Sequence, residues 1–99
     1  VVLPPRDPDI LEAFHTYVIQ VDRRTELINY LSAQGIETKI HYPIPLHLQP
    51  GFAHLGYPKG AFPIAEAQAE RILSLPIHEY LTEDQLDHVG TSIKRVYGC

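Results

Sequence analysis

The alternation of hydrophobic and polar positions predicts three short strands. Residues 14–21 (FHTYVIQV) alternate with a period of two and are rich in β-branched and aromatic side chains. Residues 36–40 (IETKI) alternate again, and residues 74–77 (SLPI) form a short apolar run. The last run is predicted at a sheet edge, because Pro76 cannot donate to a hydrogen-bond ladder. The side chains of the first strand predicted to face the core are Tyr17, Ile19 and Val21.

A helical period predicts three helices. The first covers residues 23–34, with Asp22 as its N-cap and Gly35 in the left-handed C′ position. The second covers residues 62–73, and the third follows the capping-box pattern TEDQ of residues 82–85. The apolar stripe of the third helix consists of Leu86, Val89, Ile93 and Val96.

These elements together predict an α+β fold. It consists of a small three-stranded, mostly antiparallel sheet with about three helices packed on one of its faces. Residues 1–12 contain three prolines among alternating charges, which predicts an extended linker before a domain over residues 13–99. A length of 99 residues suits one domain with a modest core.

Composition and charge exclude several classes of protein. Apolar residues at 44% and charged residues at 20% are typical of a soluble globular chain, and no apolar run is long enough to span a bilayer. A net charge of −4 disfavours nonspecific binding to nucleic acid. The N-terminus has no signal-peptide pattern. The single cysteine, Cys99, fits a reducing cytoplasmic compartment, and a frayed end is the expected state of this residue.

The segment of residues 41–61 stands apart from the rest of the pattern. It holds four prolines and three glycines and follows neither period. A loop of about 20 residues without regular structure is usually functional or disordered in a compact domain, and the aromatic content of this one argues against disorder. Its apolar side chains predict packing against another domain or subunit. Those side chains are Tyr42, Ile44, Leu46, Leu48, Phe52 and Tyr57.

Few residues suggest catalysis, and none suggests a metal site. The three histidines of this loop are six and seven residues apart, which is not the spacing of a zinc site, and no serine-nucleophile motif occurs. The segment His41–Gln49 (HYPIPLHLQ) is stiffened by its prolines. His41, Tyr42, His47 and Gln49 offer donors and acceptors for a phosphate, a carboxylate or sugar hydroxyls. On these residues alone, a ligand-binding segment and a structural loop at an interface are equally compatible.

The same segment resembles a signature of the DegT/DnrJ/StrS-type sugar aminotransferases. Residues 14–21 followed by residues 22–36 (DRRTELINYLSAQGI) resemble the first strand and helix of that family's small domain. Residues 55–89, with FPIAE and LSLPIH, resemble its closing stretch. The likeness covers about residues 3–97.

This resemblance implies the small C-terminal domain of a fold-type I aminotransferase. In such enzymes a large domain holds PLP on a Schiff-base lysine, and the enzyme moves an amino group from glutamate to a keto nucleotide-sugar. The resemblance also implies a homodimer and substrate contacts by His41 and Tyr42. Pro43, His47 and Gln49 match the same motif, and loop support or peripheral contact is expected of them.

The resemblance also implies that the chemistry belongs to the large domain. The three lysines of the chain are outside the family's lysine motif and are predicted to be surface residues; they are Lys39, Lys59 and Lys94. We therefore expect no catalytic or cofactor-binding residue here, and no activity of the chain alone. Two alternatives are a free-standing interaction or dimerisation module and part of a PLP-dependent sugar dehydratase.

Overall fold

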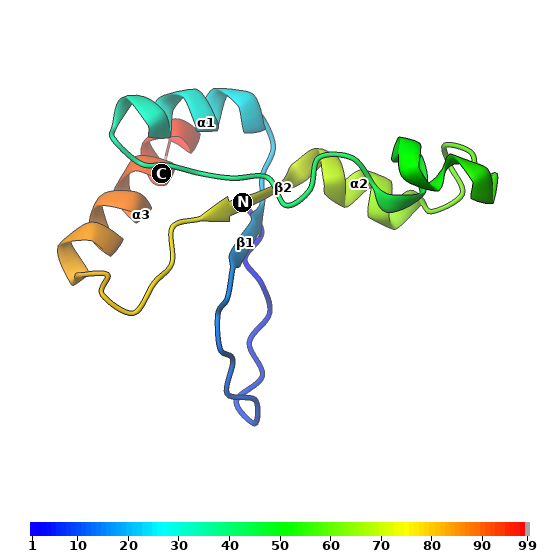
Figure 1. Ribbon diagram of the computed structural model, residues 1–99. Coiled ribbons are helices and arrows are strands. Elements are labelled where there is room, and N and C mark those ends of the chain that lie inside the picture. Colours follow the sequence, from blue (N-terminus) through cyan, green and yellow to red (C-terminus); the bar gives the residue numbers. More distant parts are fainter. Residues whose placement is uncertain (99) are drawn as a thin grey trace.

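The computed structural model describes residues 1–98. Cys99, for which a frayed end was expected, lies outside the described residues. A two-stranded antiparallel sheet occupies the centre, with α1 and α3 together beside it and α2 leading away (Figure 1). The elements are β1 (Tyr17–Gln20), α1 (Arg24–Ala33), η1 (Leu46–Leu48), η2 (Pro50–Leu55), α2 (Pro63–Arg71), β2 (Ile72–Leu75) and α3 (Glu83–Tyr97).

The register of the sheet places its apolar side chains on one face. Ile19 of β1 lies opposite Leu73 of β2, and both are fully buried. Tyr17 and Val21 share this face, and Val21 is also fully buried, so the predicted core face of the first strand is confirmed. The α+β class and the antiparallel pairing are confirmed as well.

The predicted third strand over residues 36–40 is reduced to one bridge, between Lys39 and Ser74. The strand predicted at residues 74–77 is present in part, as Ser74 and Leu75 of β2, an outer strand of the two-stranded sheet whose free side carries the bridge to Lys39. Continuing this antiparallel register would pair residue 37 with Pro76, which has no N–H to donate. At the other end, the carbonyl of Ile72 already accepts a hydrogen bond from Arg24 Nη1 at 3.1 Å. Pro76 thus ends the ladder in one direction.

Helix α1 supplies the centre of the core. Leu27 and Leu31, one turn apart, are fully buried against the sheet. Gly35 has a φ of 77°, and the N–H of Ile36 donates to the carbonyl of Leu31 at 2.9 Å, which forms the predicted glycine-capped end.

The start of α1 differs from the prediction. Asp22 does not cap it: the N-cap residue is Arg23, in a left-handed conformation, with no side-chain cap. Asp22 Oδ1 lies instead 3.3 Å from Arg71 Nε at the end of α2, where it forms an ion pair. The guanidinium of Arg23 stacks on the ring of Tyr97 and donates to the carbonyl of Val96, which ties α1 to the end of α3.

Helix α3 begins as predicted. The hydroxyl of Thr82 accepts from the N–H of Gln85 and the side chain of Gln85 accepts from the N–H of Thr82, which completes the capping box. Val89, Ile93 and Val96 pack against the core. Leu86 belongs to the same stripe but is 53% exposed, because the stripe extends beyond the surface that α1 covers.

The prediction that all three helices pack on one face was wrong for α2. Residues 42–71, here called the arm, extend away from the core (Figure 1). Along α2 only Ala69 is buried, and Ile64 is 74% exposed, because this helix has no continuous apolar stripe. Arg24 Nη1 donates to the carbonyl of Ala69 at 2.6 Å and so anchors the arm at its base. The radius of gyration is 15.7 Å, whereas a compact domain of this length has about 13 Å.

The loop predicted to lack regular structure contains the short 3-10 helices η1 and η2. Its predicted exposure is confirmed, except that Leu48 is half-buried. Within the described part of the chain, no helix has both the length and the hydrophobicity needed to cross a bilayer.

We expect Leu31→Ala to destabilise the chain by about 2–5 kcal/mol, because it opens a cavity in the centre of a small core. Urea denaturation of the 99-residue chain measures the free energy of unfolding. Leu11→Ala is the matched control, since Leu11 is 100% exposed, and it should change that free energy by less than about 0.5 kcal/mol. Equal losses in the two variants would contradict this account of the core.

Candidate functional site

His41 lies where the chain leaves the sheet, two residues after the Lys39 bridge. Its Nδ1 lies 2.9 Å from the hydroxyl oxygen of Ser74, while the residue as a whole is exposed. The ring of Tyr42 stands edge-on to the ring of His41, with 5.4 Å between the ring centres, and Tyr42 is 69% exposed. The two predicted substrate-contact residues are therefore in contact, and neither is buried in the core.

The two side chains nevertheless line different grooves. His41 lines a groove of about 250 Å³ together with His15, Lys39 and Ser74. Tyr42 lines one of about 210 Å³ between the loop and α2. Because the rings are adjacent, a ligand that contacts both must lie across the boundary between the two grooves.

The groove beside His41 is rich in hydrogen-bonding side chains. Two imidazoles, one ammonium group and the hydroxyls of Thr16, Thr38 and Ser74 line it, with Glu37 as its one carboxylate. The ammonium group of Lys39 lies 2.9 Å from a carboxylate oxygen of Glu37, and this contact raises the pKa of Lys39 and keeps it protonated. Such a set of donors suits an oxygen-rich ligand carrying hydroxyl or acidic groups.

The three residues given a supporting or peripheral role are spread along the arm. Gln49 donates to the carbonyl of Ile44 at 3.1 Å and lines the groove of Tyr42. His47 has a side chain only 7% exposed and stands edge-on to Phe62, with 4.8 Å between ring centres. Pro43 is exposed. Any substrate contact by these three residues remains a prediction.

Glu66 closes the tip of the arm. The N–H of Gly60 donates to both of its carboxylate oxygens, at 2.7 and 3.0 Å. These hydrogen bonds lower the pKa of Glu66 below its usual value, and the nearby His47, whose Nε2 lies 3.4 Å away, acts in the same direction. Desolvation of the carboxylate opposes the shift. The tip of the arm is therefore held together by hydrogen bonds that require the carboxylate of Glu66 to be ionised.

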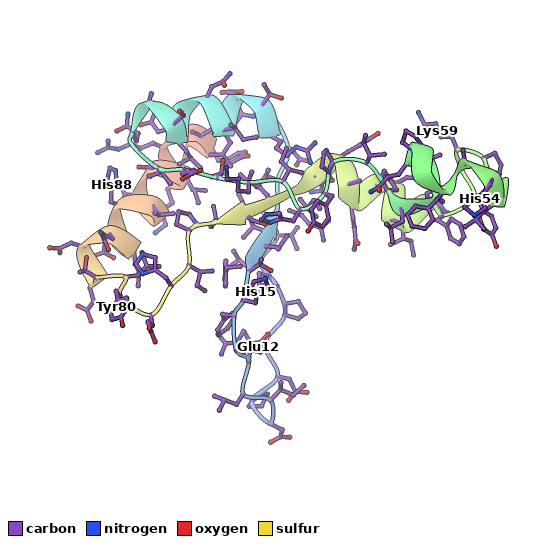
Figure 2. All side chains as sticks on the ribbon, viewed as in Figure 1. Glu12, His15, His54, Lys59, Tyr80 and His88 are labelled. Atoms are coloured by element: carbon purple, nitrogen blue, oxygen red, sulfur yellow. The ribbon has the colours of Figure 1, made fainter. Side chains whose placement is uncertain are left out.

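The other histidines lie far apart. His15, His54 and His88 are next to β1, on the arm and on α3 (Figure 2). His88 Nε2 bonds to the carbonyl of Gln34, and both His78 and His88 are exposed as predicted. Across residues 1–98, no three acidic, histidine or cysteine side chains gather in a way that could hold a metal ion.

Two residues that position the candidate site were missed in the sequence. Ser74 contacts the ring of His41, and Arg24 anchors the base of the arm. The one available signal was a serine between leucines in a buried strand, where a polar side chain requires a partner. Nothing in the sequence identified that partner.

The sequence profile of the DegT/DnrJ/EryC1/StrS aminotransferase family matches residues 1–94, and the chain belongs to this family. It is 42% identical over 94 residues to the "Erythromycin biosynthesis sensory transduction protein EryC1" of Saccharopolyspora erythraea, covering 95% of this chain and 26% of that protein. It is 42% identical over 92 residues to the dTDP-3-amino-3,4,6-trideoxy-alpha-D-glucose transaminase of Streptomyces venezuelae, covering 93% and 24%.

The fold has a counterpart among solved structures. The crystal structure of DesV from S. venezuelae, in complex with a ketimine intermediate, superposes with a TM-score of 0.89 at 38% identity. The match covers 96% of this chain and 26% of that one. The chain thus spans about a quarter of the length of the relatives it matches.

The family's cofactor, PLP, does not fit the residues of this chain. A PLP-binding lysine needs a neutral amine in a sheltered position. All three lysines are exposed, and the ammonium group of Lys39 is paired with Glu37. The expectation that they are surface residues is confirmed.

We expect the Gly60 amide proton to titrate with Glu66. Because the pKa of Glu66 is lowered, its hydrogen bonds persist above the ordinary glutamate pKa of 4.5 and are lost only as the pH falls through the lowered value. The chemical shift of the Gly60 amide, followed by NMR, should therefore change with a midpoint below 4.5. Glu66→Gln should abolish the transition, and Glu70→Gln on the same helix should leave it. A midpoint at or above pH 4.5 would contradict the hydrogen bonds between Gly60 and the ionised Glu66.

We expect the 99-residue chain to retain no PLP. After incubation with PLP and gel filtration, the protein fraction should show no absorbance from covalently bound cofactor, because no lysine is sheltered. A band that survives filtration and disappears in one of Lys39→Ala, Lys59→Ala or Lys94→Ala would show that a lysine of this chain binds the cofactor.

Proposed function

We propose that this chain is the C-terminal domain of a PLP-dependent aminotransferase that transfers an amino group from glutamate to a keto nucleotide-sugar. The observation that carries the proposal is the match over nearly the whole chain to a nucleotide-sugar transaminase, in sequence and in fold. On this proposal the rest of the enzyme supplies the catalytic lysine, and the chain alone is inactive.

In this proposal His41 and Tyr42 contact the substrate. Both are exposed on a proline-braced segment, and each lines a groove with hydrogen-bonding side chains. The imidazole of His41 and the phenol of Tyr42 suit the hydroxyl or carboxylate groups of a modified sugar. Their role is to bind and orient the substrate, because the one amine that shares a groove with His41, that of Lys39, is an ammonium group paired with Glu37.

Two uncovered apolar surfaces support the assignment to a larger, dimeric protein. The first is the arm, on which Tyr42, Leu46 and Tyr57 are each at least half exposed. The second is a groove of about 680 Å³ between the sheet and α3, which Leu86 and Tyr17 help to line. Single chains rarely leave such surfaces in water. We infer that the large domain and a second subunit cover them.

A chimera tests the proposal. This chain would replace the matching quarter of the S. venezuelae transaminase, and turnover of that enzyme's keto nucleotide-sugar with glutamate would be measured. We expect turnover from the chimera and none from the 99-residue chain alone. A folded, PLP-loaded chimera without turnover, beside an active parent enzyme, would count against the proposed activity.

We expect His41→Ala and Tyr42→Phe each to raise KM about tenfold in this chimera, with kcat changed less, because each removes a substrate hydrogen bond. The matched control is His54→Ala. His54 is exposed on the same arm, at its far end (Figure 2), and lines neither groove. Unchanged kcat and KM in both site variants would refute the substrate role of this pair.

A further inference from the structure

Ser74 is a buried polar residue whose backbone is paired on both sides. Its N–H donates to the carbonyl of Lys39 at 2.7 Å, and its carbonyl accepts from the N–H of Lys39 at 3.1 Å. On its other side β2 pairs with β1, where Val18 lies opposite Ser74. The residue is 5% exposed. Its backbone is therefore fixed in position relative to the chain that follows Lys39.

That chain carries His41. Residues two apart in an extended chain lie on the same side, so His41 follows Lys39 onto the side of the sheet where Ser74 lies. The contact of 2.9 Å between Nδ1 and the serine hydroxyl results. Nε2 makes no hydrogen bond to any other residue within the range 1–98. One ring nitrogen is thus occupied, and the other is available to a ligand.

We propose that Ser74 is a positioning residue that fixes both the orientation and the tautomer of His41. In the neutral ring one nitrogen carries a proton and the other accepts, and the partner of one nitrogen decides which state the other adopts. If Nδ1–H donated to Ser74, the buried hydroxyl proton would have no acceptor among the described residues. Unpaired buried donors are rarer than unpaired acceptors. The hydroxyl therefore donates to Nδ1, and the proton of the ring stays on Nε2.

The consequence for binding rests on the proposed function. An Nε2–H group that faces outward can donate to a hydroxyl or carboxylate oxygen of the substrate, whereas the other tautomer can only accept. Ser74 would then select for an oxygen acceptor at this point of the substrate. It acts through His41 and needs no contact with the substrate itself.

The tautomer can be measured on the 99-residue chain itself. Nitrogen-15 NMR at a pH where the ring is neutral should show Nε2 protonated and Nδ1 unprotonated. A hydrogen bond of about 0.5–1.5 kcal/mol corresponds to a two- to twelvefold bias, so Ser74→Ala should shift the tautomer ratio toward Nδ1–H by that factor. Ser74→Thr keeps the hydroxyl and should keep the ratio, while amide spectra report that the variants are folded. Protonated Nδ1 in the unmodified chain, or an unchanged ratio in folded Ser74→Ala, would overturn the proposal.

A double-mutant cycle in the chimera supplies the second readout. Ser74→Ala should raise KM two- to twelvefold when His41 is present and should add nothing in the His41→Ala background. Additive effects would overturn the positioning role. Loss of turnover in the unmodified chimera would instead count against the proposed activity, and the tautomer measurement would then decide the role of Ser74 by itself.

Discussion

The position of β2 between two partners is the constraint on which both the core and the site depend. One side of β2 pairs with β1, and this pairing directs Leu73 into the core opposite Ile19. The other side pairs with Lys39 through an isolated bridge, which places Ser74 beside His41. Because side chains alternate along a strand, Leu73 faces the core and the next residue, Ser74, faces the groove beside His41. A shift of one residue in this register would bury the serine in the core and move Leu73 into the groove.

The arm is stabilised by polar contacts at its ends rather than by a core of its own. At its base Arg24 donates to the carbonyls of Ala69 and Ile72, which satisfies groups that the end of a helix leaves unpaired. At its tip the carboxylate of Glu66 accepts from Gly60. These contacts define the shape of the arm while its apolar side chains stay exposed. A surface preformed in this way loses less conformational entropy when a partner covers it.

Features that depend on residues close together in the sequence could be predicted, whereas features that depend on residues far apart in the sequence could not. The capping box at Thr82 and the left-handed Gly35 depend on neighbours within a few residues, and both were predicted. Asp22 was predicted as a cap, but Arg23 takes the N-cap position and the side chain of Asp22 lies beside Arg71, almost fifty positions away. The exposed pair at His41 could be located by resemblance. Its partner Ser74 could not, because only the register of the sheet brings the two together.

The same difference in range separates the orientation of His41 from the shelter that a reactive lysine requires. Orienting an imidazole requires one buried hydroxyl and a short bridge, and both lie within residues 39–74. Sheltering a neutral lysine requires an enclosed cavity, and each lysine of this chain is exposed. The groove beside His41 is open to solvent, where a single hydrogen bond to a ligand has to compete with water. Covering the groove with a second protein surface would strengthen the same hydrogen bond, because exclusion of water lowers the local dielectric constant. The orientation of His41 therefore comes from this chain, whereas the strength of its contact depends on what covers it.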